Sequence, residues 1–224
     1  MWHDFDSAAA STEAQSRQIA QLLSSAVDRG QKARLAVSGG RSPIPLFERL
    51  SNEDIPWHNV AITLVDDRYV PVDHEDSNEA LVRRYLLQNR ASAASFTGLV
   101  GDADDIARSV ERANRLTGHI DVAVLGMGDD GHTASLFPDA AQLPDALDPQ
   151  QVRRYLHITP PTAAHERISM TLAALLAVGH LILPIAGEHK RNVLRKAQEA
   201  PTPALPVSYV ATQHGVPLDV YWHP

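Results

Sequence analysis

The chain contains 224 residues, of which 44% are hydrophobic and 21% are charged, and this suits one α/β domain over residues 1–224 with a core that needs no crosslinks. It contains no cysteine, which excludes disulfides, cysteine nucleophiles and thiolate metal sites. A formal net charge of −7 gives no general attraction to nucleic acid or anionic membranes, so an anionic substrate has to be held by individual Arg, Lys and backbone N–H groups.

Helical and extended patterns alternate along the chain. Apolar spacing and capping residues predict helices over residues 8–28, 43–50, 78–87, 103–117, 165–177 and 188–199. Short aliphatic and β-branched runs predict strands over residues 34–37, 60–65, 121–125, 180–183 and 218–222. This alternation predicts an α/β fold, with a mainly parallel sheet and helices on both faces.

Serines and prolines mark several of the predicted boundaries. Ser42 and Ser77 are placed as helix N-caps. Pro184 is expected to end the strand at 180–183, and Pro217 argues that the last strand lies at an edge of the sheet. The stretch 138–149, rich in Pro and Asp, is predicted to be a surface loop.

The sequence also lacks the usual patterns of membrane insertion and secretion. Its most apolar stretch, residues 172–185, is too short to span a bilayer and is interrupted by Gly, His and Pro. The start is acidic, without the basic-then-apolar order of a secretion signal. We therefore expect a cytoplasmic protein without membrane or nucleic-acid partners.

The first polar run follows the strand predicted at 34–37 and contains Ser38, Gly39, Gly40 and Ser42. Glycines let a backbone approach a ligand closely, and the start of the following helix offers free N–H groups to an anion. A phosphate fits these features. A tight turn between strand and helix explains them equally well.

The second polar run, Asp66-Asp67-Arg68, follows the strand predicted at 60–65. Arg68 suits a phosphate, or the charge that develops on a reacting carbonyl oxygen. Alternatively, Arg68 is a surface residue paired with one of the two aspartates.

The third polar run follows the strand predicted at 121–125, and its three glycines shape a tight loop that ends at His132. Histidine can take a proton from water near neutral pH. Asp130, two residues earlier, can fix the tautomer of the ring and support its protonated form. A loop histidine that caps a following helix is the alternative. In parallel sheets the carboxyl ends of strands share an edge, so the three runs can converge on one crevice.

The spacing of Gly126, Gly128 and Gly131 also satisfies the dinucleotide-binding fingerprint. We rank this interpretation low, because Asp129 and Asp130 would repel a pyrophosphate. Pro138 leaves little room for the long helix that such a site requires, and the acidic residues about 20 positions later lie in the Pro-rich stretch.

The remaining histidines give no metal site by spacing. His157 and His165 are too far apart for one helical turn, and His214 and His223 lie near the C-terminus. Most of them are expected at the surface.

Taken together, residues 34–196 resemble the 6-phosphogluconolactonase family. The most specific part is 126–138, which is similar to Gly-Met-Gly-x-Asp-Gly-His-Thr-Ala-Ser-Leu-Phe-Pro. Four further runs are similar to Ser-Gly-Gly-x-Thr-Pro, Asp-Glu-Arg-x-Val-Pro, Arg-Ile-Thr-Leu-Thr and Gly-x-x-Lys, at residues 38–43, 66–71, 167–171 and 187–190. Ser42 replaces Thr and keeps its hydroxyl, whereas Asp67 replaces Glu and shortens its reach.

The resemblance implies hydrolysis of 6-phosphoglucono-δ-lactone in the oxidative pentose phosphate pathway, with no organic cofactor and no required metal. It implies a fold shared with glucosamine-6-phosphate deaminases and ribose-5-phosphate isomerases, and we expect a monomer whose partner is a small phosphorylated sugar lactone. His132 would be the base, oriented by Asp130, with Arg68 and N–H groups near Gly128 at the oxyanion. The remaining substrate-binding residues, mainly for the phosphate, would be Ser38, Gly39, Gly40, Ser42, Arg167 and Lys190.

Two other functions stay open at this point. An amino-sugar phosphate deaminase or isomerase shares the Asp-Gly-His core but differs in the residues that follow it. A non-catalytic sugar-phosphate sensor on the same fold would bind its ligand without turnover, and the presence of His132 and Asp130 argues against it.

Overall fold

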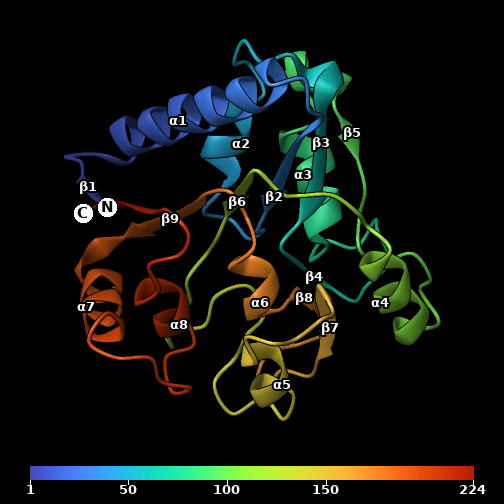
Figure 1. The fold of residues 1–224 in the computed structure, drawn as a ribbon, viewed down its shortest axis with the longest axis vertical. Coiled ribbons are helices and arrows are strands. Elements are labelled where there is room, and N and C mark those ends of the chain that lie inside the picture. The colour runs from blue at the N-terminus through green and yellow to red at the C-terminus, as the bar shows by residue number, and fades with distance from the viewer.

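The computed structural model describes all residues, 1–224, and centres on a seven-stranded sheet in which every neighbouring pair of strands is parallel (Figure 1). The strand order is β1-β10-β9-β6-β2-β3-β5. The strands are β1 (Trp2–Asp4), β2 (Ala33–Val37), β3 (Val60–Leu64), β5 (Ser95–Phe96), β6 (Val122–Val124), β9 (Leu181–Ala186) and β10 (Leu218–His223). From β2 the chain moves to β3 and β5 on one side, and then returns to β6 on the other side of β2. The order therefore reverses between β2 and β6, which is where ligands bind in such sheets.

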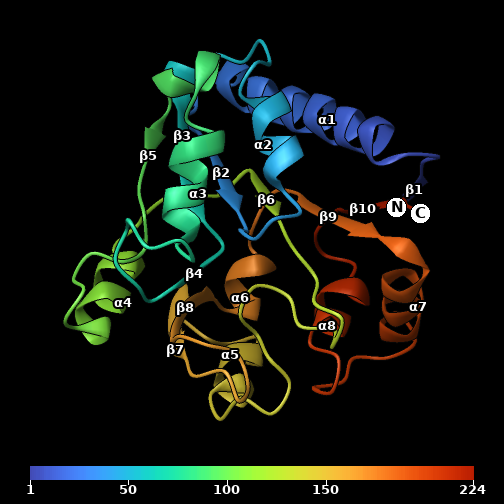
Figure 2. The ribbon, with the colours of Figure 1, turned by 180° about the vertical axis from the view of Figure 1, so that it is seen from behind.

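Helices cover both faces of this sheet, which confirms the predicted fold class (Figures 1 and 2). The helices α1, α2 and α3 lie on one face, and α6, α7 and α8 lie on the other. The α-helices are α1 (Ala8–Asp28), α2 (Ile44–Leu50), α3 (Asn78–Tyr85), α4 (Ile106–Asn114), α5 (Leu143–Leu147), α6 (Leu172–Leu175), α7 (Gly187–Ala197) and α8 (Val207–Ala211). None of them is long and apolar enough to cross a membrane.

The helix predicted over 165–177 is wrong in its first half. Residues Arg167–Met170 form the strand β8, which pairs antiparallel with β4 (Asp66–Arg68) and β7 (Tyr155–Ile158) in a second, three-stranded sheet. All four residues of β8 are buried. Their polar and apolar side chains alternate as in a strand, but the run is only four residues long and leads directly into the apolar stretch that contains α6, so the sequence prediction merged the two. Thr171 ends the strand and caps the short α6 by accepting a hydrogen bond from the Ala174 N–H.

Pro184 lies inside β9, although the sequence predicts that it ends this strand. Residues two apart in a strand direct their backbone groups toward the same neighbouring strand, so Pro184 and Ile182 share a partner. The Ile182 carbonyl accepts a hydrogen bond from the Leu125 N–H, which identifies that partner as the segment of β6. The ladder between β6 and β9 extends only to Val124 opposite Ile182. Proline lacks an N–H donor, and none is needed at 184 because β6 has already ended there.

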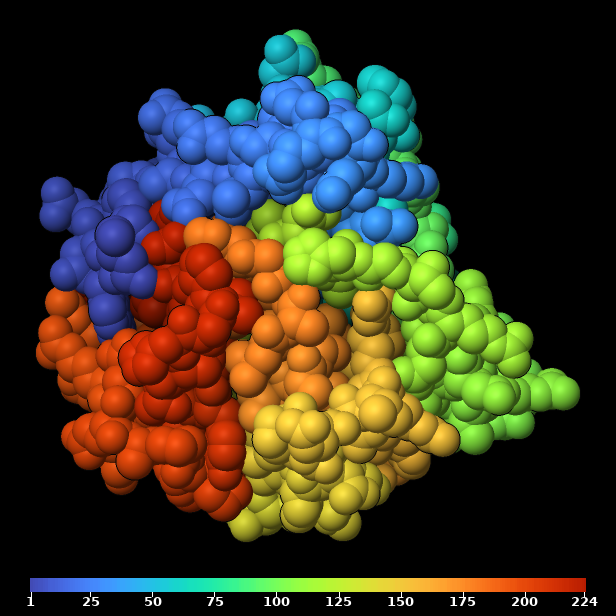
Figure 3. Space-filling model, viewed as in Figure 1, coloured from blue at the N-terminus to red at the C-terminus, as the bar shows by residue number.

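The strand β10 lies inside the sheet, not at its edge as Pro217 suggested. β1 pairs with β10 on its outer side, so the N-terminus supplies the edge strand and the two termini lie side by side (Figure 1). In Figure 3 the blue N-terminal part accordingly rests against the orange and red C-terminal part. Pro217 precedes the first residue of the strand, a position where a missing donor costs no ladder bond.

Asp219 on β10 ties the N-terminus to the sheet. Its carboxylate accepts hydrogen bonds from Gln18 Nε2 at 2.6 Å, His180 Nε2 at 2.7 Å and His3 Nε2 at 2.8 Å. Burial on its own would raise the pKa of this carboxyl, but these hydrogen bonds lower its pKa to about 2. The folded state therefore favours the ionised form.

This carboxylate predicts an acid-sensitive contribution to stability. Because the pKa is lower in the folded state, the contribution is complete above about pH 4 and is lost as the pH falls toward 2. Its size is roughly 2 kcal/mol, at about 1.4 kcal/mol per pKa unit. We expect Asp219→Asn to lower the free energy of unfolding by that amount at pH 5, and by clearly less at pH 3. Urea titrations at both values measure the difference, and an equal deficit at pH 5 and pH 3 would contradict the prediction.

The stretch 138–149 is more ordered and more buried than the predicted surface loop. It contains α5, whose Leu143, Ala146 and Leu147 are buried in the core.

The predicted helix at 103–117 is shorter in the structure, because Asp105 caps α4 by accepting a hydrogen bond from the Arg108 N–H. Ser77 is confirmed as the N-cap of α3, whereas Pro43, not Ser42, stands at the start of α2.

Candidate active site

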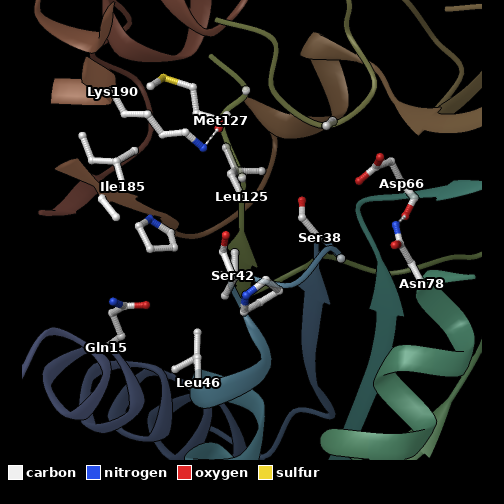
Figure 4. A pocket seen from close by; sticks show the side chains of 18 of the residues that line it. Gln15, Ser38, Ser42, Leu46, Asp66, Asn78, Leu125, Met127, Ile185 and Lys190 are labelled. Atoms are coloured by element: carbon white, nitrogen blue, oxygen red, sulfur yellow. Dashed lines mark hydrogen bonds between the residues drawn. The ribbon is translucent and has the colours of Figure 1, made fainter. Parts of the chain in front are cut away.

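A cavity of about 270 Å³ opens at the carboxyl ends of β2, β6 and β9, at the point where the strand order reverses (Figure 4). All three predicted polar runs contribute to its lining, as the sequence predicted. The predicted residues that line it are Ser38, Gly39, Ser42, Arg68, Gly128, His132 and Lys190. Asp130 lies behind His132, and neither Gly40 nor Arg167 reaches the lining.

His132 and Asp130 form a hydrogen-bonded pair at the cavity. His132 Nδ1 lies 2.6 Å from Asp130 Oδ1, and an ionised carboxylate only accepts, so Nδ1 carries the proton. The same oxygen accepts from the His132 N–H at 3.1 Å. The other ring nitrogen, Nε2, therefore keeps a free lone pair. The ring of Phe137 packs against the imidazole, with 4.5 Å between the ring centroids.

The residues that follow His132 hold the loop in place without a helix. Thr133 is fully buried and donates its hydroxyl to the Gly126 carbonyl at 2.8 Å. Ser135 is also buried and donates its hydroxyl to Asp66 Oδ2 at 2.6 Å, which links the third polar run to the second. Ala134 between them adopts a left-handed backbone with φ of 50°. The absence of a helix directly after Gly131 agrees with the low rank of the dinucleotide interpretation.

The Gly128 N–H is already used within this loop, because it donates to the His132 carbonyl at 2.9 Å. It is therefore not free to serve as one of the oxyanion donors that the sequence suggested near Gly128. Gly128 makes room for the His132–Asp130 pair. A Cβ atom there would lie 2.2 Å from His132 Nδ1 and 2.6 Å from Asp130 Oδ1.

The loop after β2 brings a free hydroxyl and a closely packed glycine to the cavity. Ser38 Oγ is buried and has no hydrogen-bond partner, so it remains available to a ligand. A Cβ atom on Gly39 would lie 1.9 Å from Asn78 Oδ1, and only glycine fits there. Gly40 has φ of 95°, in the left-handed region that favours glycine. Ser42 lines the cavity instead of capping α2.

Asp67 is a structural residue beneath the site. Its fully buried carboxylate accepts hydrogen bonds from the N–H groups of Arg68, Asn78 and Glu79 at 2.8, 2.7 and 3.2 Å. Burial, with a smaller contribution from the charge of Asp66, raises its pKa to about 7 against these donors. Asp67 thus fixes the end of β4 against the start of α3, a role that its shorter side chain fulfils.

Lys190 and Arg167 occupy different positions relative to the cavity. Lys190, in the first turn of α7, donates from Nζ to the Met127 carbonyl at 2.7 Å (Figure 4). Arg167 on β8 lies directly opposite Arg68 on β4 and is buried, with Nη1 lacking any partner. Burial, and then the nearby charge of Arg68, lower the pKa of the Arg167 guanidinium.

The sequence did not reveal several residues that line the cavity. Asn78, a buried residue at the first position of α3, and Gln15 of α1 face it (Figure 4). His223, predicted at the surface, lies at the end of β10 and also lines the cavity. Of these residues, only Asn78 lies close in sequence to the second polar run, and this proximity was the one available signal. Gln15 and His223 come from distant segments that the sheet topology brings to the cavity.

One cluster outside the cavity brings together groups that could hold a metal ion. The ligand atoms of His74, Asp76 and His165 lie within 4.8 Å of one another. Sequence spacing could not reveal this cluster, because His165 comes from a distant segment. His165 Nε2 lies 3.0 Å from Asp76 Oδ2, and His74 Nδ1 accepts from the Asp76 N–H, so internal hydrogen bonds already join the three residues.

Comparisons with known proteins identify the family of this chain. The sequence model of the glucosamine-6-phosphate isomerase/6-phosphogluconolactonase family matches residues 6–222. The chain belongs to this family. A 6-phosphogluconolactonase of Neisseria meningitidis serogroup A is 43% identical over 227 aligned residues, covering 99% of this chain and 98% of the relative. The resemblance found in the sequence is thereby confirmed.

Solved structures give the same result. The crystal structure of a 6-phosphogluconolactonase from Shewanella baltica is 40% identical, covers 100% of this chain and 97% of its own, and superimposes with a TM-score of 0.93. A monomeric glucosamine-6-phosphate deaminase is only 17% identical but has a TM-score of 0.80 over 99% of this chain and 96% of its own. The second likeness confirms the expected kinship of fold with the deaminases.

Proposed function

We propose that this chain hydrolyses 6-phospho-D-glucono-1,5-lactone to 6-phospho-D-gluconate, the lactonase step of the oxidative pentose phosphate pathway. The observation that carries the proposal is the His132–Asp130 pair, which faces a cavity that also contains Arg68, Lys190 and the unpartnered Ser38 hydroxyl. These groups supply a base for water and cationic partners for an anionic substrate. Family membership and relatives named 6-phosphogluconolactonase support the same activity.

The proposed reaction begins with water beside His132. Nε2 of His132 takes a proton from this water as its oxygen forms a bond to C1 of the lactone. Asp130 keeps the proton on Nδ1 and stabilises the imidazolium that forms. The bond between C1 and the ring oxygen then breaks, and His132 returns its proton to that oxygen. The products are a carboxylic acid, which ionises, and a free hydroxyl group.

The carbonyl oxygen of the lactone becomes negatively charged in the tetrahedral intermediate, and this charge needs a hydrogen-bond donor. Because the Gly128 N–H is occupied, Arg68 is the donor that we assign to this oxyanion. The Arg68 guanidinium forms hydrogen bonds only with uncharged acceptors, Asp76 O and Asn78 Oδ1. Its positive charge is therefore not neutralised by a direct carboxylate partner.

The phosphate end is assigned to the loop after β2 and to the start of α7. Ser38 and Ser42 offer hydroxyls, Gly39 and Gly40 allow close approach, and Lys190 supplies a charge. Arg167 does not line the cavity, but its partnerless Nη1 is typical of a buried cation that an anion completes. We assign it an indirect share in the positive field there, alongside Arg68.

We further propose that the chain acts as a monomer in the cytoplasm. The residues assigned above can be supplied by one chain, as a monomeric enzyme requires. The relatives are named for a reaction of a phosphorylated sugar acid lactone, and such intermediates belong to metabolism inside the cell.

Fresh 6-phosphogluconolactone tests the proposal directly. The lactone is made in place from glucose 6-phosphate, and acid release is followed with and without the purified chain. We expect release well above the spontaneous rate, and a rate equal to the spontaneous one would refute the assignment. Glucosamine 6-phosphate, offered separately, should release no ammonia; release of ammonia instead would identify a deaminase.

A further inference from the structure

Arg68 is held at the cavity by a fixed set of neutral acceptors. Its Nη1 donates to the Asp76 carbonyl at 2.9 Å and to Asn78 Oδ1 at 3.0 Å. Neither of these acceptors is a carboxylate. Only these two acceptors fix the guanidinium, so its other donors remain free for substrate.

Asn78 can act as such an anchor because its own position is strongly determined. Its Nδ2 donates to the Asp66 carbonyl at 2.8 Å (Figure 4), and its backbone N–H donates to Asp67 Oδ1 at 2.7 Å. The residue is only 3% exposed. Because Nδ2 is directed to a carbonyl, Oδ1 has to face Arg68. The side chain thus has one orientation in which every partner is satisfied.

The same side chain also packs against the loop after β2. A Cβ atom on Gly39 would overlap the Asn78 carboxamide, with 1.9 Å to Oδ1 and 2.2 Å to Cγ. The carboxamide therefore touches both the loop that contains Gly39 and the side chain of Arg68 at the end of β4. A shift of Asn78 would move both.

We propose that Asn78 is a positioning residue for this reaction, which holds the Arg68 guanidinium toward the substrate through Oδ1. The proposal rests on the proposed function, in which Arg68 contacts the substrate. Asparagine suits this position because it accepts from an arginine and donates to a carbonyl at the same time. Aspartate could not donate to Asp66, and it would neutralise Arg68 and add a third carboxylate beside Asp66 and Asp67.

A double-mutant cycle tests the coupling. We expect Asn78→Ala to lower kcat/KM for the lactone by roughly tenfold or more, as expected for loss of a hydrogen bond to a charged group. The loss should fall on the same parameter, kcat or KM, as the loss caused by Arg68→Ala. In the Arg68→Ala background, Asn78→Ala should have almost no further effect. Additive losses in the double variant, or full activity of Asn78→Ala, would overturn the proposal.

Ser77→Ala is the matched control, because it changes the adjacent residue in the same helix. It removes the hydrogen bond from the Ala80 N–H to Ser77 Oγ, and should lower the melting temperature while kcat/KM stays near the wild-type value. Equal losses of activity in Ser77→Ala and Asn78→Ala would show that α3 acts only as a scaffold, against the proposal.

Two further measurements keep the test decisive. If Asn78→Ala does not fold, Asn78→Leu replaces it in the same cycle, because leucine keeps the branched shape of the side chain but offers Arg68 no acceptor, and the same absence of additivity is expected. If the wild type proves to lack lactonase activity, the proposed function fails. The coupling between Asn78 and Arg68 can then still be measured as the affinity of each variant for 6-phosphogluconate, determined by calorimetry. Equal binding by wild type and Asn78→Ala would then overturn the positioning role.

Discussion

Replacing His132 with alanine is expected to lower kcat for lactone hydrolysis by about 10²–10⁴-fold, the usual contribution of a general base. The physical reason is that water is a poor nucleophile until its proton has an acceptor. Nε2 of His132 is free to accept, since Nδ1 is engaged by Asp130 at 2.6 Å. Initial rates of acid release, corrected for spontaneous hydrolysis, measure the effect.

The fold should survive this substitution. The His132 side chain is 29% exposed and its ring packs on one side against Phe137, so its loss opens little buried space. His157→Ala is the matched control, because His157 is also a histidine paired with a carboxylate, Glu166, but does not line the cavity. Near-normal lactonase activity in His132→Ala, or an equal loss in His157→Ala, would contradict the assignment of the base.

Replacing Gly128 with alanine is expected to produce a loss of about 10²-fold without removing any catalytic group, because a displacement of about 1 Å can cost that much. The new Cβ would lie 2.2 Å from both Cε1 and Nδ1 of His132. The imidazole has to move, and its hydrogen bond to Asp130 has to distort. The backbone itself accepts alanine, because φ at Gly128 lies outside the left-handed region.

Gly126→Ala is the control within the same loop. A Cβ there would meet only Ser38 Cβ, at 4.0 Å, which is an ordinary contact, so its activity should stay within a few-fold of the wild type. Steady-state rates and thermal unfolding of both variants separate a displaced base from a damaged fold. Similar activities for the two alanine variants would show that the position of His132 tolerates the added methyl group.

Local patterns predicted which residues lie at the cavity better than they predicted the contacts that hold those residues in place. His132 and Asp130 are two residues apart in sequence, so their pairing depends only on the shape of one loop. The three polar runs were placed correctly at one edge of the sheet, because parallel strands bring their carboxyl ends together. Arg167 was recognised as part of a motif, but its position opposite Arg68 depends on the pairing of β4 with β8.

The errors in secondary structure have a common cause. The segment 167–170 is too short for its alternating pattern to establish a strand, and it forms one because β4 and β7 pair with it. Pro184 continues a strand because β6 stops before reaching it. Pro217 precedes an inner strand because the N-terminus supplies the edge. Each outcome depends on a neighbouring strand that is distant in sequence.

The sequence by itself therefore determined the fold class, the family and the candidate base with its aspartate, because these depend on periodicity and on contiguous motifs. Only the tertiary structure decided that the Gly128 N–H is occupied, that Asp67 supports α3 and that Asn78 anchors Arg68. Hydrogen bonds and close packing between separate segments are set by how the chain folds back on itself. No local pattern specifies which distant atoms will meet.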